Sequence, residues 1–362
     1  MLFHSVLLCE KRRKEAKELN APLVSVIIPV YNVKPYLREA LDSVLHQTYR
    51  NLEIIIIDDG ATDGSEKLCD EYQRMDDRVT VMHQKNSGLS AARNTGLDVM
   101  HGKIVAFLDS DDAYCADYFE VMVKAMIAKN ADIAVCGFYT CYTRNKMERF
   151  PCRRIQHRLE NGCYCADEAL SRMADQKLNP AVWNKIYRAE LFDSLRFPVE
   201  HNYEDVLLIP FLFEKAKTVL AIDRPLMYYR KRPDSITVTP SVKNIRDFVY
   251  FIHFRSDYIA KHTPAVFSKE QKLRNIDTSL KSCIVLYAER VLLRGSDHAK
   301  RILGTEIKKE SIHIHHCSLT TKVLFFFYSL NPYICCALIK CYRPVGYLIK
   351  VFHAFFPGNK MI

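Results

Sequence analysis

Two groups of acidic residues in the first third of the chain each follow a short apolar run. Asp58 and Asp59 come after one run, and Asp109, Asp111 and Asp112 come after another. Taken singly, such residues are common as helix caps or in turns. Together they are different, because five carboxylates close to one another repel unless a cation or hydrogen-bond donors offset their charge. Ligand sets made only of oxygen favour Mg²⁺ or Mn²⁺ over zinc, which indicates metal-assisted chemistry on an anionic group.

The sequence lacks the two glycine-rich loops that bind phosphate groups directly. A dinucleotide-binding fold carries GxGxxG after its first strand, whereas the first apolar run here leads into Pro29-Val30-Tyr31-Asn32. The phosphate-binding motif GxxxxGK(S/T) does not occur either. A diphosphate held through a carboxylate-bound divalent cation fits both the missing loops and the acidic groups.

Alternating strands and helices must position these carboxylates. We expect strands at 24–30, 52–57, 79–83, 103–108 and 132–136, and helices at 37–45, 90–100 and 117–129. This alternation predicts βαβ units, and therefore an open α/β domain with a mainly parallel sheet. Because ligands bind outside the carboxyl ends of the strands in such sheets, both acidic groups are expected at the same edge.

Four motifs occur in order along this predicted domain. They are VSVIIPVYN at 24–32, DDGATDGS at 58–65, NSGLSAARNTG at 86–96 and LDSDD at 108–112. This series resembles the family 2 glycosyltransferases of GT-A fold, densely over residues 22–137 and more thinly over 181–238. The resemblance implies a Rossmann-like domain that binds a nucleotide-sugar and transfers the sugar with inversion of its anomeric carbon.

The resemblance also implies roles for residues on the donor side. The turn after the first strand and Asp59 would frame the base and ribose, where a carboxylate accepts the N3–H of uracil. Asp109 and Asp111 match the DxD motif, for the ribose and for the Mn²⁺ or Mg²⁺ that bridges the diphosphate. The residues implied in nucleotide-sugar binding are Pro29, Tyr31, Asn32, Asp59, Arg93, Asp109 and Ser110. Arg93 and Asn94 would help to close the nucleotide pocket. The alternative for Arg93 is an ion-paired or solvated position on the surface of a helix.

On the acceptor side, Asp205 is the candidate general base. It stands in Tyr203-Glu204-Asp205, before an apolar helix, where two acids at a helix N-terminus are the structural alternative. The Glu-Asp motif of the family selects Asp205, and a positioned base is typically worth about 10²–10⁴-fold in rate. Further candidates for acceptor or diphosphate contacts are Asp112, Trp183, Asn184, Lys185, Glu204, Arg230 and Arg232. A core position for the single Trp and a solvated basic turn at 229–232 are alternatives.

The rest of the chain divides by composition. We expect a basic lead-in at 1–21, a nucleotide-sugar-binding half at 22–140, an acceptor-binding half with the base at 141–240, and a helical region at 241–362. Residues 311–362 hold five Lys or Arg and no acid, with apolar stretches at 323–339 and 345–356. Such a basic and apolar tail is typical of an interfacial anchor on an anionic membrane. A helical cap packed on the core, or a dimer surface, is the alternative.

The composition narrows the class of protein. The 13 cysteines are odd in number and scattered, which favours a reducing cytosol, and the net charge of +10 comes without a nucleic-acid-binding motif. We therefore expect a hexosyl- or N-acetylhexosaminyl-transferring glycosyltransferase, peripheral on the cytoplasmic face of the cell membrane. It would use a nucleotide-sugar, most simply a UDP-sugar, and a glycan or lipid-linked acceptor in cell-surface polysaccharide synthesis. A metal-dependent nucleotidyltransferase and an inactive sugar-binding scaffold are the alternatives.

Overall fold

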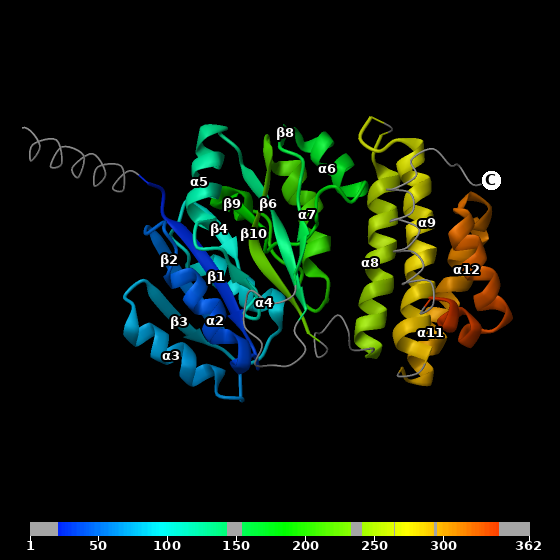
Figure 1. Cartoon of the computed structure of the whole chain (residues 1–362), viewed down its shortest axis with the longest axis horizontal. Helices are drawn as coiled ribbons and strands as arrows, with labels where there is room; N and C mark the ends of the chain where they lie inside the picture. The colour runs from blue at the N-terminus through cyan, green and yellow to red at the C-terminus, as the bar shows by residue number, and fades with distance from the viewer. Residues whose placement is uncertain (1–20, 143–153, 233–240, 264, 293–294, 340–362) are drawn as a thin grey trace, which may run out of the picture. The chain divides into compact units, whose positions relative to one another are not determined.

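The structure is a computed structural model, shown in Figure 1. It describes residues 21–142, 154–232, 241–263, 265–292 and 295–339. The chain forms two compact units, residues 1–232 and 233–362. The predicted lead-in, apart from Ala21, and the predicted apolar stretch at 345–356 lie outside the described residues.

A single ten-stranded sheet runs through the first unit, in the order β3-β2-β1-β4-β9-β6-β10-β5, with β7 pairing with β6 and β8 with β10. Because this sheet continues from residue 24 to residue 231, the two halves predicted at 22–140 and 141–240 share one sheet. The strands are β1 Val24–Val30, β2 Leu52–Asp58, β3 Val79–His83, β4 Ile104–Phe107, β5 Ala113–Tyr114, β6 Ile133–Tyr142, β7 Arg154–His157, β8 Gly162–Tyr164, β9 Lys185–Arg188 and β10 Val219–Lys231.

The first four strands in the sheet order are parallel, as the sequence predicts. β1 pairs in parallel with β2 and with β4, and β2 pairs in parallel with β3. β9 then interrupts this arrangement, because it pairs antiparallel with both β4 and β6, while β6 and β10 are again parallel. The predicted α/β class with a mostly parallel central sheet is confirmed.

Helices cover both faces of the parallel strands, which explains why all seven residues of β1 are buried. Alternate β1 residues, from Val24 to Val30, pack in one core with residues of α2 and α3. On the opposite face, Gly96 of α4 lies so close to Ile27 that an added Cβ would be 2.5 Å from its Cγ2. The helices of this unit are α2 Lys34–Leu45, α3 Ser65–Met75, α4 Leu89–Val99, α5 Tyr118–Ala128, α6 Ala166–Ala174, η1 Ala189–Phe192 and α7 Glu204–Lys215.

The second unit is helical, which confirms the predicted helical C-terminal region. Serine side chains cap the N-termini of four of its α-helices, and leucine, isoleucine and cysteine residues form a separate core. Its elements are α8 Val242–Lys261, α9 Lys269–Leu286, η2 Tyr287–Val291, α11 Asp297–Glu310, η3 Ser311–His316 and α12 Leu319–Leu330. Within the described residues, no helix combines the length and the apolar character needed to cross a bilayer.

Candidate active site

Asp59 organises the loop that leads into α4. Its Oδ1 accepts hydrogen bonds from Gln84 Nε2 (2.7 Å) and the Ser87 amide (2.8 Å), and its Oδ2 accepts one from the Gly88 amide (2.8 Å). Gly60 makes this approach feasible, because it has a φ of +75° and an added Cβ would lie 2.9 Å from the Asn86 amide nitrogen. Asp59 is only 3% exposed. Its buried carboxylate therefore fixes the backbone of the loop through the amides of Ser87 and Gly88.

Arg93, on α4, joins the end of β4 to the start of α7. Its Nη2 donates to Asp109 Oδ1 (2.7 Å), and its Nη1 donates to Glu204 Oε1. The guanidinium also lies over the ring of Phe197, 5.2 Å from its centroid. Burial opposes the charge on Arg93, but Asp109 and Glu204 outweigh this effect and raise its pKa. Arg93 is 1% exposed, so the structure places it inside an ionic network.

The loop before α7 is fixed against α4 by a reciprocal pair of hydrogen bonds. Asn94 Nδ2 donates to the Phe197 carbonyl, and the Phe197 amide donates to Asn94 Oδ1, both at 2.9 Å. Tyr203, the residue before the helix, adopts a left-handed conformation with φ 65°, which turns the chain into α7. Asn94 therefore helps to set the position of the Glu204–Asp205 pair.

Asp205 lies in the first turn of α7 and is partly exposed. Its Oδ1 accepts a hydrogen bond from the Val206 amide (2.8 Å). Burial, and after it the charge of Glu204, raises the pKa of Asp205 to about 7, although the positive charge of Arg93 acts in the opposite direction. A carboxylate with such a pKa is a better proton acceptor near neutral pH than one with the usual pKa near 4.

Two arginines at the end of the β10 segment bind the residues after β4. Arg232 Nε donates to Asp111 Oδ2 (2.6 Å). The Arg230 amide donates to Asp112 Oδ1 (2.8 Å), and its Nε donates to the Asp111 carbonyl (2.9 Å). Burial raises the pKa of both carboxyls, opposed at Asp111 by Arg232 and reinforced at Asp112 by Asp111. Ser110, between the aspartates, is buried.

The turn after β1 is tied to the DDGATDGS loop. Asn32, with φ 50°, accepts a hydrogen bond on Oδ1 from the Thr62 amide (2.8 Å). Pro29 is buried within β1, whereas Tyr31 is 50% exposed. Of the residues predicted to frame the nucleotide base, Tyr31 and Asn32 are therefore exposed, whereas Pro29 and Asp59 are buried.

Trp183, Asn184 and Lys185 lie inside the protein. Trp183 stacks on Tyr229 with ring centroids 5.1 Å apart. Asn184 Nδ2 donates to the Cys136 carbonyl, and Lys185 Nζ donates to the carbonyls of Asn179 and Ala181 and to Asn184 Oδ1. Burial lowers the pKa of Lys185 to about 7. Since Asn184 and Lys185 are fully buried, neither side chain presents a surface to an acceptor, and the core position is the one observed for Trp183.

The residues after β4 fit a divalent cation, although no three of them form a preassembled cluster. Asp109 Oδ2 and Asp111 Oδ1 receive no hydrogen bond from a described residue, and their side chains are 26% and 19% exposed. Asp112 Oδ2 is buried and likewise has no hydrogen-bond partner among the described residues. These free carboxylate oxygens are the donors that Mg²⁺ and Mn²⁺ prefer. Within the described chain, only His253, Glu306 and Glu310 bring three metal-binding atoms within 4.8 Å of one another.

The two acidic groups are therefore linked by the protein itself. Asp59 holds the residues that begin α4, and Arg93 of the same helix holds Asp109. The sequence predicted a metal ion to offset the negative charge of these carboxylates. In the structure, Arg93, Arg230 and Arg232 offset part of this charge. Glu39 of α2, which was not among the predicted site residues, also belongs to this network, because its Oε2 accepts a hydrogen bond from Arg230 Nη2 (2.6 Å). No local signal distinguishes Glu39 from an ordinary charged residue on a helix.

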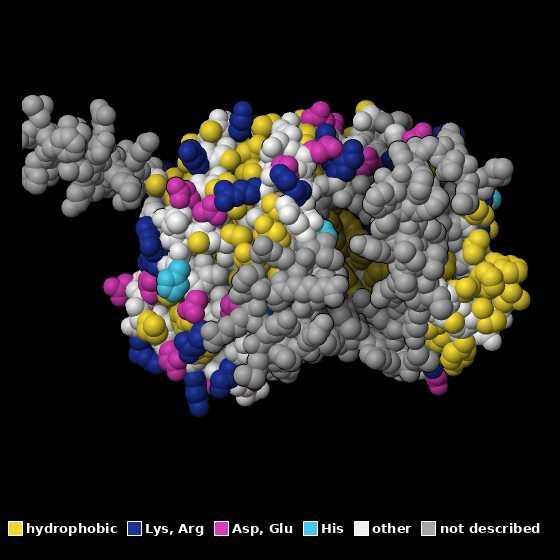
Figure 2. Space-filling model, in the orientation of Figure 1, with side chains coloured by type: hydrophobic (Ala, Val, Ile, Leu, Met, Phe, Trp, Pro, Cys, Tyr) yellow, Lys and Arg dark blue, Asp and Glu magenta, His cyan; other side chains and the backbone are white. Residues whose placement is uncertain are grey.

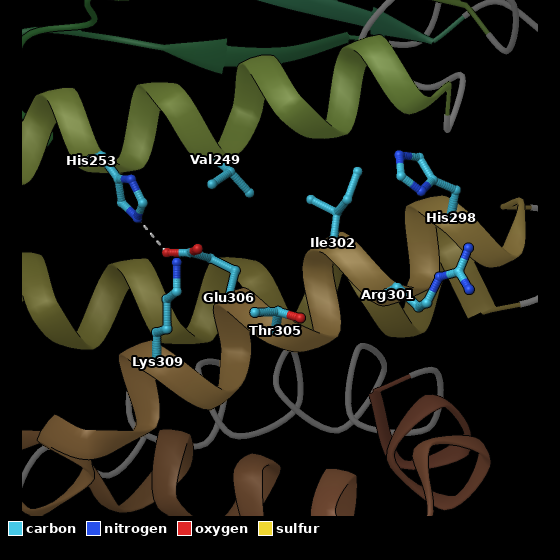
Figure 3. Close-up of a pocket in the computed structure, with 8 residues that line it drawn as sticks. All are labelled: Val249, His253, His298, Arg301, Ile302, Thr305, Glu306 and Lys309. Atoms are coloured by element: carbon cyan, nitrogen blue, oxygen red, sulfur yellow. Dashed lines mark hydrogen bonds and ion pairs between the residues drawn. The ribbon is translucent and has the colours of Figure 1, made fainter.

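Two residues of this group, His253 and Glu306, line a pocket of the second unit, shown in Figure 3. His253 and Glu306 form a 2.5 Å hydrogen bond between α8 and α11. Figure 3 also shows Lys309 directed toward the Glu306 carboxylate. Burial and the charge of Glu306 raise the pKa of Glu310, while His253 and Arg255 lower it. The positive charges that act on Glu310 therefore offset only part of the effect of burial and of Glu306.

Comparisons with known proteins identify similar chains. The model described as glycosyl transferase family 2 matches residues 25–199. Glycosyltransferase GlyA of Streptococcus pneumoniae is 38% identical over 223 residues, 59% of this chain but 31% of GlyA, so this chain spans about a third of that relative. Putative glycosyltransferase EpsH of Bacillus subtilis is 31% identical over 283 residues, 76% of this chain and 78% of EpsH.

A solved structure shares the fold over most of the chain. The crystal structure of S. aureus TarS 1-349 in complex with UDP-GlcNAc matches with a TM-score of 0.63 and 18% sequence identity, covering 89% of this chain and 92% of that one. At this identity the match shows that the two chains share a fold.

Proposed function

The chain belongs to glycosyl transferase family 2, and from this we propose that it transfers a sugar from a nucleotide-sugar to a hydroxyl group of a glycan or a lipid-linked acceptor. The donor is a UDP-sugar, the anomeric carbon is inverted in one in-line displacement, and the product is part of a cell-surface polysaccharide. The UDP assignment is supported by the UDP-GlcNAc complex of TarS.

The observation that carries this proposal is the ionic bridge made by Arg93. It joins Asp109, the first aspartate of the DxD motif, to Glu204, the neighbour of Asp205. Because Arg93 contacts both Asp109 and Glu204, the bridge supports a donor side that lies next to the base. The charge of Asp109 also contributes to raising the pKa of Asp205. An inverting transfer needs this proximity, because the base and the leaving group act on opposite sides of the same anomeric carbon.

Asp205 is the general base in this proposal. Its Oδ1 is held by the Val206 amide, whereas no described residue donates to its Oδ2. The free Oδ2 takes the proton of the acceptor hydroxyl while the oxygen of that hydroxyl attacks the anomeric carbon of the sugar. With a pKa of about 7, the carboxylate is ionised in about half of the protein molecules at pH 7 and still accepts a proton readily.

The residues after β4 act on the leaving group. Asp109 and Asp111 would hold Mn²⁺ or Mg²⁺, which when bound supplies positive charge to stabilise the departing diphosphate. Arg232, 2.6 Å from Asp111, holds one oxygen of that carboxylate and so orients the other. Asp59 still has acceptor capacity on Oδ2 beside its three bonds to the protein, which is compatible with a contact to the N3–H of uracil.

We further propose that the protein works at the inner face of the cell membrane. The absence of any acid between residues 311 and 362, together with five Lys or Arg, supports attraction to anionic lipid. A lipid-linked acceptor would then be presented at the same surface.

The test is a panel of nucleotide-sugars. UDP-, GDP- and dTDP-sugars are screened with Mn²⁺ by thermal shift, and hydrolysis and transfer are then measured for the donors that bind. Asp205→Asn should keep the affinity for the donor within about threefold while the rate of transfer falls about 10²–10⁴-fold. A variant that retains the wild-type rate would reassign the base, and a panel in which no UDP-sugar binds would refute the donor class.

A further inference from the structure

The outer face of α12 is apolar and exposed. Leu319, Val323, Phe326 and Leu330, at spacings of four, three and four residues, are 78%, 43%, 58% and 61% exposed. Residues three and four apart lie on the same side of a helix, so the four side chains form one stripe, which we call the α12 face. Figure 2 shows hydrophobic side chains gathered over α12.

The inner side of the same helix accounts for its attachment to the second unit. Thr321 is buried, and Leu324, Phe325, Phe327 and Tyr328 pack against the core of that unit. The helix is thus apolar on nearly all sides. A helix of this kind is normally buried all round, and the inner contacts leave the α12 face unexplained.

The segment that follows α12 also exposes apolar side chains. Residues 332–339 are helical, and within them Ile334 and Leu338 are 47% and 36% exposed, while Tyr333 is 60% exposed. Contiguous exposed apolar surface of this kind marks a site of association with a protein or a membrane.

The charge composition of the chain from residue 311 onward favours a membrane. Lys322 on α12 is exposed, and the sequence from residue 311 to 362 carries four further Lys or Arg and histidines at 313, 315, 316 and 353, with no Asp or Glu. A surface that buries apolar side chains between two copies of the chain does not require the exclusion of acids over 52 residues. Binding to an anionic lipid surface favours such an exclusion of acids, because the negative lipid headgroups would repel each Asp or Glu near them.

We propose that the α12 face is the surface by which this protein inserts into an anionic bilayer. The four apolar side chains enter the boundary between headgroups and acyl chains, and the basic groups contact lipid phosphates. This inference extends the membrane location proposed above and is independent of the assignment of donor and base.

The experiment is co-sedimentation of the full chain with vesicles, without donor or acceptor. Vesicles of 30% phosphatidylglycerol in phosphatidylcholine should pellet the wild type, and vesicles of phosphatidylcholine alone should pellet much less. Phe326→Ser/Leu330→Ser should lower the partition coefficient about 100-fold, a factor of ten for each side chain that no longer enters the bilayer. Raising KCl from 0.1 to 0.5 M should weaken binding by screening the basic groups.

The matched control is Met75→Ser/Ile127→Ser, because these side chains are exposed to a similar extent, 70% and 53%, on the first unit. It should bind vesicles like the wild type. Equal binding by both double variants, or no binding by the wild type, would overturn the proposal. So would a wild-type dimer that Phe326→Ser/Leu330→Ser converts to a monomer in sedimentation analysis, since a second copy would then cover the α12 face. Turnover of a water-soluble acceptor is measured in parallel, so that loss of the proposed catalysis and loss of membrane binding are read separately.

Discussion

Arg93→Met is the most informative single change, because it removes a buried positive charge from between two carboxylates. The guanidinium is 1% exposed and contacts both Asp109 and Glu204. Methionine fills a similar volume beside Phe197 but donates no hydrogen bond. Glu204, 6% exposed, would then lose the only hydrogen-bond donor to its side chain that the described residues provide.

The expected cost follows from that burial. Removing one partner of a buried ion pair typically costs about 3–5 kcal/mol, because the other charge stays buried without compensation. For a unit of this size each kcal/mol lowers the melting temperature by about 2–4 °C. Arg93→Met should therefore lower the melting temperature of the first unit by about 6–20 °C. The pKa of Asp205 should also rise further, since the positive charge of Arg93 holds it down.

The assay is thermal unfolding followed by circular dichroism and by differential scanning calorimetry. Arg38→Met is the control, because the ion pair of Arg38 with Glu71 is long (3.7 Å) and both side chains are more than half exposed; such pairs contribute about 0–1 kcal/mol. Arg93→Met/Glu204→Gln should recover a large part of the lost stability, because the uncompensated charge is gone. If Arg93→Met melts within 2 °C of Arg38→Met, or if the double variant is no more stable than the single one, the buried bridge does not hold α4 to α7 as described.

Four further predictions concern the site. The pKa of Asp205 is about 7 in the folded protein and about 4 in the unfolded chain. The folded state therefore binds more protons between pH 4 and 7, and the stability of the wild type falls as the pH rises through this window. Asp205→Asn should abolish this loss of stability, so its melting temperature should exceed that of the wild type by a margin that grows from pH 4 to 8. In the wild type, kcat/KM should rise with pH to a plateau above about 7, and a flat profile would exclude Asp205 as the base. Mn²⁺ with UDP should raise the melting temperature of the wild type, and Asp111→Asn should remove this rise. The control is Asp117→Asn, because Asp117 forms an ion pair with Arg224 at the surface, and this variant should keep the rise. If the two variants respond equally to Mn²⁺ and UDP, the cation binds elsewhere. Lys185→Met should destabilise the protein by about 1–3 kcal/mol because carbonyl groups lose their donor, while the KM for the acceptor stays unchanged; a raised KM with unchanged stability would return Lys185 to the acceptor site.

Much of the fold could be predicted because its signals are local. The continuous apolar residues of β1 and β2 mark strands buried on both faces, and the observed bounds of β1 and β3 are those expected from the sequence. The helix α3 was not predicted, although its buried Leu68, Cys69 and Tyr72 lie on one side. The antiparallel insertion of β9 between β4 and β6 was not predictable either, because strand order depends on contacts between residues far apart in the chain.

The sequence by itself determined which carboxylates lie at the ends of the parallel strands, since strand, turn and motif are all read from neighbouring residues. Only the tertiary structure decided what those carboxylates contact. Arg93 and Glu204 are 111 residues apart in sequence, and the burial that gives their bridge its strength does not exist until α4, the end of β4 and α7 have packed together. The same packing encloses Lys185 and raises the pKa of Asp205. Charge alone is a property of the residue, whereas its pairing and exposure to water are properties of the folded chain.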